Sequence, residues 1–154
     1  MAARTLSLEQ ISDRIEIDDL LIRYTVAIDT KDWELLDTVF TPDAKVDYTT
    51  SGDIKGDYPE VRAWLAKVLS SFKMTQHLIG NSVVEIEGDT AKARTMVFNP
   101  MGTDDGGGGL RMFYVGAWYV DTLVRTDAGW RIADRFEEQA FFDSSPSKVL
   151  ELSS

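Results

Sequence analysis

The first half of the chain carries hydrophobic residues at helical intervals. Between residues 7 and 29, apolar side chains recur every three or four positions with charged residues between them, which predicts one long amphipathic helix. Ser7 and Gln10 have the spacing of a capping box, which marks the start of this helix. A short second helix is predicted over about residues 32–41. It should end at residue 41, because the residue before a proline resists helical dihedrals. A third amphipathic stripe predicts a helix over residues 57–72.

The second half of the chain alternates between apolar and polar residues. A short strand is predicted earlier, over residues 44–48, and helical spacing is absent from Met74 onward. Four long strands are predicted at about residues 74–87, 90–100, 110–125 and 129–142. Turn signals that contain glycine join the first of these strands to the second and the third to the fourth, so we expect two antiparallel hairpins.

Four consecutive glycines lie in the connection between the second and third long strands, within residues 102–109. Glycines lose much conformational entropy on ordering and offer no side chains to pack, so a flexible hairpin tip is the first interpretation. A mobile lid over a pocket is the alternative. Together the elements predict an α+β fold, with three helices packed on one face of a curved antiparallel sheet.

Length and charge limit the class of protein. A chain of 154 residues, 44% hydrophobic and 27% charged, predicts a single domain over residues 1–154, with a core at about 7–143 and a C-terminal tail at 144–154. A net charge of -10 disfavours nucleic acid and anionic membranes as partners. Because no apolar run reaches the length of a membrane span and the N-terminus has no apolar signal core, we expect a cytoplasmic protein.

The residues that titrate or bind metals are few. One histidine and no cysteine exclude a zinc site built from His and Cys ligands and also a thiol nucleophile, and we expect neither metal nor organic cofactor. His77 can accept a proton near neutral pH, and a carboxylate such as Asp29 can hold it in one tautomer. Asp29 lies near the negative end of the first helix, where a carboxylate is unfavourable. The alternatives are structural: Asp29 could organise the following turn, and His77 could be a buried residue bonded to a backbone carbonyl.

Several motifs occur in an order that is typical of one superfamily. They are Ile22–Tyr24, Ile28–Trp33, Phe40–Ala44, Val46–Tyr48, Thr75–Asn81 and Gly129–Ile132. Over roughly residues 10–142, the chain resembles the SnoaL-like branch of the nuclear-transport-factor-2-like superfamily. The resemblance implies a cone-shaped sheet with the helices on its concave face, enclosing a pocket in which Asp29 faces His77.

The resemblance also implies site residues. Dehydratases of this superfamily use such an Asp–His pair to remove a proton and expel a leaving group. Tyr24 matches a helix tyrosine of bile acid 7α-dehydratase, and Tyr48 matches a strand tyrosine of scytalone dehydratase. The chain departs from both at Asn99, where they place a histidine or an aspartate, and near Gln139, where the bile acid enzyme has a catalytic arginine.

These residues predict a lyase of the dehydratase type that acts on a hydrophobic cyclic substrate, similar to a polyketide or a steroid. His77 would be the general base, Asp29 would orient it, and Tyr24 or Tyr48 would stabilise the developing oxyanion. The substrate would contact a mostly apolar wall. The predicted wall residues are Trp64, Val97, Asn99, Phe113, Ala117 and Tyr119.

Other functions remain open. The same pair could support an isomerase or a cyclase, since both begin with proton removal. A non-catalytic domain that binds a small molecule or holds an oligomer together is a second class. A water-activating epoxide hydrolase is a third, and it would need Arg94 or Arg135 to point inward between two carboxylates. An aromatic outer sheet face also predicts a homodimer or larger homo-oligomer; it carries Met112, Tyr114, Trp118 and Val120.

Overall fold

The computed structural model describes residues 5–144, so the predicted tail lies almost entirely outside the described residues. Three helices and seven strands make up this part of the chain, which confirms the α+β class. The helices are α1 (Leu8–Thr30), α2 (Trp33–Leu36) and α3 (Tyr58–Leu69). The strands are β1 (Phe40–Asp47), β2 (Lys55–Asp57), β3 (Phe72–Thr75), β4 (Leu78–Glu87), β5 (Thr90–Asp104), β6 (Leu110–Thr126) and β7 (Gly129–Asp143).

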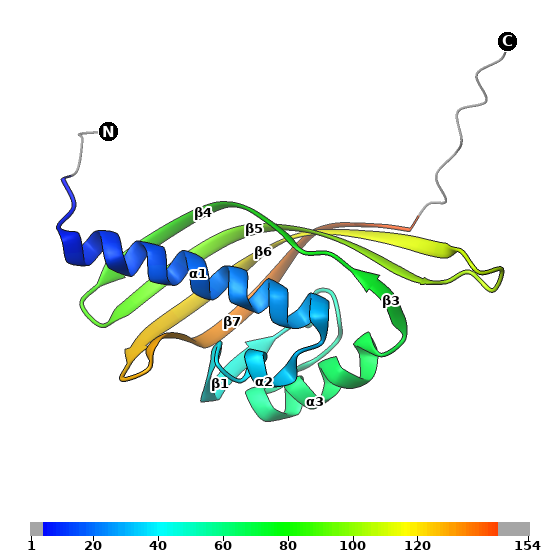
Figure 1. Ribbon diagram of the computed structural model, residues 1–154, viewed down its shortest axis with the longest axis horizontal. Helices are drawn as coiled ribbons and strands as arrows, with labels where there is room; N and C mark the ends of the chain where they lie inside the picture. Colours follow the sequence, from blue (N-terminus) through cyan, green and yellow to red (C-terminus); the bar gives the residue numbers. More distant parts are fainter. Residues whose placement is uncertain (1–4, 145–154) are drawn as a thin grey trace, which may run out of the picture.

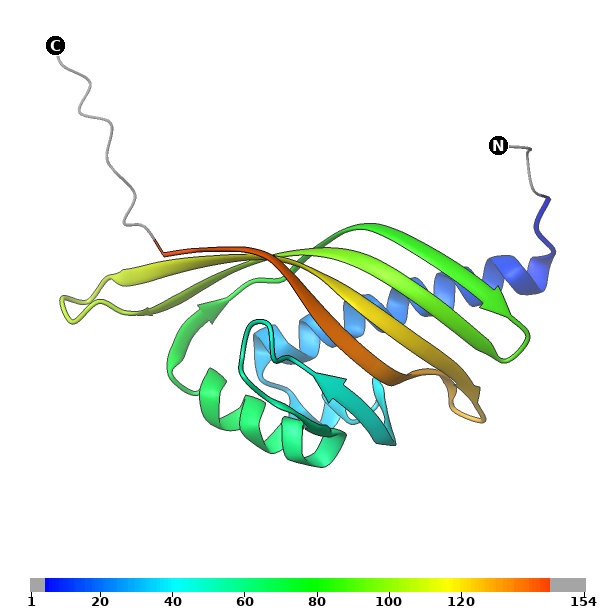
Figure 2. The ribbon, with the colours of Figure 1, turned by 180° about the vertical axis from the view of Figure 1, so that it is seen from behind.

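All seven strands belong to one curved sheet, with the helices on its concave side (Figure 1, and from behind in Figure 2). The strand order is β2-β1-β7-β6-β5-β3, and β4 pairs with the other part of β5. The strand pairs are antiparallel as predicted, except that β1 pairs parallel with β7. Most of the chain separates these two strands, which leaves ample length for the crossover that parallel pairing requires.

Helix α1 has the predicted start and the predicted buried face. Ser7 accepts a hydrogen bond from the backbone of Gln10, and the Gln10 side chain accepts one from the backbone of Ser7, as in a capping box. Ile17, Leu20 and Ile28 are almost completely buried against the sheet. The helix therefore runs along the concave face and brings its last turn, with Asp29, next to the junction of β3 and β4.

The second helix is shorter than predicted. Only Trp33–Leu36 is helical, and strand β1 already begins at Phe40, inside the range predicted as helix. Phe40 is paired with Ile132 of β7, and the carbonyl of Val39 accepts a hydrogen bond from the backbone of Ile132. These pairings with a distant strand override the helical spacing of the local sequence.

The strand predicted over residues 74–87 is divided in two. β3 pairs with the distal part of β5, from Phe72 opposite Thr103 to Thr75 opposite Met101, whereas β4 starts again at Leu78 opposite Phe98. The break leaves residues 76 and 77 outside the strands. His77 therefore occupies a junction between two strands and not a regular strand position.

Strands β5 and β6 form a long hairpin that projects beyond the helices (Figure 1). Strand β5 continues further than predicted, to Asp104, whereas β6 starts at Leu110 as predicted, so only residues 105–109 form the tip. The Asp105 carboxylate accepts hydrogen bonds from the backbones of Gly107 and Gly109 at 2.8 and 2.9 Å. None of the residues 104–109 lines the cavity that His77 borders, whereas Met101, Thr103 and Phe113 in the arm of the hairpin do.

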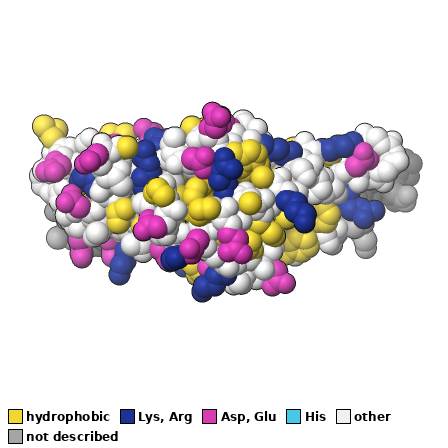
Figure 3. Space-filling model, turned by 90° about the horizontal axis from the view of Figure 1, so that it is seen from below, with side chains coloured by type: hydrophobic (Ala, Val, Ile, Leu, Met, Phe, Trp, Pro, Cys, Tyr) yellow, Lys and Arg dark blue, Asp and Glu magenta, His cyan; other side chains and the backbone are white. Residues whose placement is uncertain are grey.

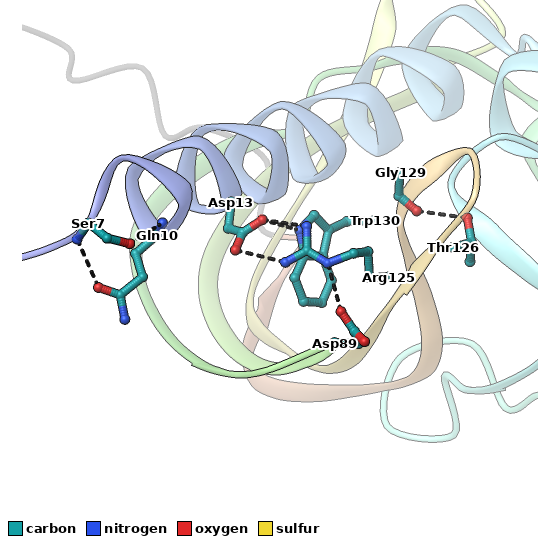
Figure 4. A network of polar contacts seen from close by, with 8 residues as sticks. All are labelled: Ser7, Gln10, Asp13, Asp89, Arg125, Thr126, Gly129 and Trp130. Carbon is teal, nitrogen blue, oxygen red and sulfur yellow. Dashed lines mark hydrogen bonds and ion pairs between the residues drawn. The ribbon is translucent and has the colours of Figure 1, made fainter.

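An ion-pair network fastens the first turns of α1 to the far end of the sheet (Figure 4). Arg125 donates two hydrogen bonds to the nearly buried carboxylate of Asp13, at 2.6 and 2.9 Å, and a third to Asp89. Its guanidinium lies 4.7 Å from the ring centre of Trp130, whose indole N–H also donates to Asp13. The hydrogen bond from Arg125 lowers the pKa of Asp13, so this carboxylate stays ionised in the fold.

Within residues 5–144, no helix lies against the outer face of the sheet (Figures 1 and 2). Met96, Phe98 and Phe141 are exposed by 41, 39 and 49%, and Tyr114 stacks on Phe98 with ring centres 6.1 Å apart. The residues predicted to form an interface, Met112, Tyr114, Trp118 and Val120, are partly exposed on β6. A contiguous aromatic surface of this kind is typical of a protein interface.

We therefore expect a homodimer or larger homo-oligomer that forms through this face, and the Phe98→Asp variant should dissociate it because a carboxylate would be buried without a partner. Light scattering would then give the mass of a 17.3 kDa monomer. The matched control is Ile15→Asp, which places the same charge on an exposed apolar position of α1. A wild-type protein that is monomeric at micromolar concentration would contradict the prediction, and dissociation by Ile15→Asp alone would move the interface to α1.

Viewed from below, the surface shows acidic and basic side chains interspersed around a central hydrophobic area, and no basic patch gathers on this face (Figure 3). Together with the net charge of -10, this distribution disfavours an electrostatic contact with nucleic acid there. Among residues 5–144, no helix has the length and apolar character needed to cross a membrane.

Candidate active site

A cavity of about 300 Å³ lies between the end of α1, helix α3 and the concave face of the sheet. Its wall is mostly apolar, with aliphatic and aromatic side chains from α3, β5 and β6. The polar groups that interrupt this wall come from six places in the chain and converge on one space. They include Tyr24, Tyr48, Ser51, His77, Asn99, Tyr119 and Glu137.

Asp29 and His77 are in direct contact. The imidazole Nδ1 lies 2.6 Å from Asp29 Oδ1, and the backbone N–H of His77 donates to Asp29 Oδ2 at 2.8 Å. Thr75 donates a third hydrogen bond, from its hydroxyl to Oδ1 at 3.0 Å. The carboxylate thus replaces the strand pairing that is missing at the junction of β3 and β4, and it fixes both the backbone and the ring of His77.

The charge state of this pair follows from its hydrogen bonds. Partial burial by itself would raise the pKa of Asp29, but the hydrogen bonds from His77 and Thr75 outweigh burial and lower it. An ionised Asp29 accepts a hydrogen bond from Nδ1–H, so the neutral imidazole carries its lone pair on Nε2, on the side of the ring away from Asp29. Only 5% of the His77 side chain is exposed, and the residue lines the cavity. The arrangement can accept a proton from a molecule bound there.

Three tyrosines surround this part of the cavity. The hydroxyls of Tyr24 and Tyr48 are 2.9 Å apart, and the ring of Tyr24 packs edge-on against Tyr119 and His77, with ring centres 5.3 and 6.1 Å away. Burial raises the pKa of all three hydroxyls well above 10, so they stay protonated. Tyr24 also hydrogen-bonds to Tyr119, so the three hydroxyls form one network that can reorient toward a ligand oxygen.

A buried ion pair supports the tyrosines from behind. Arg135 of β7 and Asp121 of β6 form two hydrogen bonds of 2.7 Å, and neither side chain is exposed. The guanidinium also lies 4.1 Å from the ring centres of Tyr24 and Tyr119. Arg135 points inward but has a single carboxylate partner and does not line the cavity, and Arg94 pairs with Glu138 on the outer face. The arginine between two pocket carboxylates that an epoxide hydrolase would need is therefore not formed by either residue.

Glu137 is a second carboxyl group in the cavity, and the sequence analysis missed it. It lies on β7 directly opposite Tyr119 of β6 and accepts a hydrogen bond from the Ser51 hydroxyl. Burial raises its pKa, while Ser51 and the positive charge of Arg135 partly oppose that shift. Strand alternation places residues 135, 137 and 139 on one face, but the sequence alone does not say which face lies inside.

The structure places most of the predicted wall residues in the cavity. Trp64, Val97, Asn99, Phe113 and Tyr119 line it. Ala117 does not, because it is buried opposite Val97 within the β5–β6 ladder. The carbonyl oxygen Oδ1 of Asn99 is buried without a hydrogen-bond partner among the described residues, which makes it a polar group that a bound molecule can satisfy.

The sequence analysis also missed cavity residues that come from a turn and from the end of a distant strand. Ser51 and Gly52 belong to the turn before β2, and Phe142 lies near the end of β7, where it stacks on Phe113. Neither segment carries a local motif that would have identified it. Within the described part of the chain, no group of three or more His, Cys, Asp or Glu side chains is arranged to hold a metal ion.

Comparisons with known proteins agree with this fold. Uncharacterized proteins of Mycobacterium tuberculosis and Mycobacterium bovis are 46% identical over 136 residues, which is 88% of this chain and 91% of theirs. The crystal structure of the Kfla4162 protein from Kribbella flavida is 25% identical with a TM-score of 0.79, and it covers 86% of this chain and 93% of its own.

A more distant solved structure has the same architecture. Hexachlorocyclohexane dehydrochlorinase LinA-type3 from Novosphingobium barchaimii is 18% identical with a TM-score of 0.77, over 91% of this chain and 94% of its own. At that identity the likeness concerns the fold alone. The family model of the SnoaL-like domain matches residues 9–135. The chain therefore belongs to the SnoaL-like family, within the nuclear-transport-factor-2-like superfamily.

Proposed function

We propose that the protein is a cofactor-independent lyase that removes a proton next to a carbonyl group and expels a leaving group, most simply water. The observation that carries the proposal is the contact between Asp29 and His77 at 2.6 Å, at the edge of an apolar cavity. A carboxylate behind an imidazole holds the tautomer that accepts a proton and stabilises the imidazolium that forms.

In this mechanism Nε2 of His77 accepts the proton from the carbon next to the carbonyl. The electron pair moves toward the carbonyl oxygen, and a hydroxyl of the Tyr24–Tyr48 pair donates a hydrogen bond to that oxygen. The protonated state of these hydroxyls and the low polarity of the wall support this role. The resulting enolate then expels the β-substituent and forms the carbon–carbon double bond.

The cavity also limits the substrate. A volume of about 300 Å³ is at the small end of ligand pockets and suits a substrate of one or two rings better than a tetracyclic steroid. Trp64, Phe113 and Phe142 offer flat apolar surfaces for such rings. The unpaired amide oxygen of Asn99 would accept a hydrogen bond from a substrate hydroxyl.

An assay with a labelled substrate tests the reaction class. We expect bicyclic β-hydroxy ketones, deuterated at the α-carbon, to lose one deuterium and the β-oxygen, which mass spectrometry and the absorbance of the conjugated product would detect. Reactions run in ¹⁸O-labelled water separate the alternatives. Elimination leaves no label in the product, a hydrolase introduces ¹⁸O, and an isomerase changes neither mass nor oxygen content except by deuterium exchange.

A non-catalytic binding domain would give a different result. It would retain such ketones in equilibrium dialysis without loss of deuterium, even over long incubation at high protein concentration. That result across a panel of one-ring and two-ring ketones would contradict the proposed lyase.

A further inference from the structure

Glu137 is a largely buried acidic side chain that the proposed proton abstraction does not use. It lines the same cavity as His77, and its strand β7 lies away from the β3–β4 junction that carries His77. Elimination of water needs two proton transfers, one from carbon and one to the departing oxygen, because hydroxide is a poor leaving group. His77 provides the first transfer, and the second has no donor so far.

We propose that Glu137 is the general acid that protonates the leaving hydroxyl group. This inference rests on the proposed lyase function and adds the second catalytic residue to it. The C–H bond breaks and its proton goes to Nε2 of His77, while its electron pair forms the double bond. The C–O bond breaks with its electrons on oxygen, which takes the proton from Glu137 and leaves as water. One proton then passes through solvent from imidazolium to carboxylate and restores both groups.

The local structure holds this carboxyl group in place. The hydroxyl of Thr50 donates to the backbone carbonyl of Glu137 at 2.6 Å and accepts from the backbone of Gln139 at 3.2 Å, which fastens the turn after β1 to β7. Ser51 of the same turn donates to Oε1 of Glu137. This hydrogen bond fixes the orientation of the carboxyl group within the cavity.

The electrostatic surroundings favour the neutral acid. Burial raises the pKa of Glu137, although interactions with Ser51, Arg135, His77 and Tyr119 work in the opposite direction. The positive charge of Arg135 is already neutralised by Asp121, at two distances of 2.7 Å. The neighbouring hydroxyls are much weaker acids, since burial raises their pKa further; they are Tyr24, Tyr48 and Tyr119. Glu137 is therefore the better proton donor in the cavity.

A stability measurement tests the proton on Glu137 without any substrate. A carboxyl group whose pKa is raised on folding binds more protons in the native state, so its contribution to stability falls as pH rises above its unfolded pKa, near 4.3. The Glu137→Gln variant lacks this loss. The difference between its Tm and that of the wild type should therefore increase from pH 4 toward pH 8. The matched control is Glu138→Gln on the outer face. The hydrogen bond from Arg94 lowers the pKa of Glu138, so its Tm difference should change in the opposite direction.

The same variants, with carbon-13 in their glutamate carboxyl groups, give the titration directly by NMR. The signal that is missing in Glu137→Gln should titrate above the ordinary range of glutamate, near 4.3. If that signal titrates at or below this value, Glu137 is ionised at neutral pH and the inference is wrong. This result does not depend on finding a substrate.

The kinetic experiment compares two leaving groups on one ring system, a β-hydroxy ketone and the corresponding β-acetoxy ketone. Acetate leaves without full protonation, so Glu137→Gln should lower kcat/KM for the hydroxy ketone by about 10²- to 10⁴-fold and that for the acetoxy ketone by less than about 10-fold. Equal losses on both substrates, or no loss on the hydroxy ketone, would overturn the role of Glu137. His77→Gln should abolish both reactions. If it does not, the proposed lyase mechanism itself fails, which separates the two outcomes.

Discussion

The Asp29→Asn variant is expected to lower kcat by about 10²- to 10⁴-fold, a smaller loss than in His77→Gln, while the affinity for substrate changes little. Asp29 accepts from the imidazole and Thr75 on Oδ1 and from the backbone of His77 on Oδ2. An amide keeps a single acceptor oxygen. If its NH₂ faces the imidazole, Nδ1 must become an acceptor and the proton moves to Nε2, which removes the base.

The nearby residue Asp32 provides a matched control. Its side chain caps α2 by accepting a hydrogen bond from the backbone of Leu35 at 2.9 Å, and asparagine caps helices equally well. Asp32→Asn removes the same charge three residues away and should retain wild-type kcat. An Asp29→Asn enzyme with wild-type kcat would refute the acid–base mechanism.

The Arg135→Met variant is expected to lose about 3–5 kcal/mol of folding stability, because it leaves the Asp121 carboxylate buried without its partner. A typical domain has about 5–15 kcal/mol of stability, so the variant should unfold at much lower urea concentration. The tyrosine cluster should also loosen, since the guanidinium packs 4.1 Å from the rings of Tyr24 and Tyr119.

The double variant Asp121→Val/Arg135→Met separates the loss of an ion pair from the loss of packing. It removes both buried charges and should recover much of the stability, as replacement of a buried pair by apolar residues often does. Arg94→Met is the control, because it breaks the exposed pair with Glu138 on the same sheet and should change the urea midpoint little. A single variant as stable as wild type would show that Asp121 finds another partner or takes up a proton at little cost.

The sequence by itself predicted the long first helix, the third helix and most of the sheet. These elements depend on local signals: a capping box at Ser7, regular apolar spacing and glycine turns. Ordered motifs also indicated the SnoaL-like family, which the family match over residues 9–135 confirms. In the same way Asp29, His77, Tyr24 and Tyr48 were predicted as neighbours, and the structure places them around one cavity or in direct contact with its wall.

Where the local signals predicted the wrong element, long-range strand pairing determined the structure. Residues 37–41 have helical spacing, yet Phe40 pairs with Ile132 in a parallel ladder with β7. The strand predicted over residues 74–87 is interrupted because Asp29, almost 50 positions earlier in the sequence, takes the backbone N–H of His77. Neither partner can be identified from the neighbouring sequence, because the hydrogen-bond partners of a strand can lie far away in the sequence.

The tertiary structure alone decided which charged residues face inward. An alternating strand has two equivalent faces in the sequence, and a shift of one residue exchanges them. The observed register of β6 and β7 turns Asp121, Arg135 and Glu137 inward and leaves Glu138 outside with Arg94. The buried ion pair and the acidic cavity residue are consequences of that register, which is fixed by packing against α1 and by the turn that carries Thr50 and Ser51.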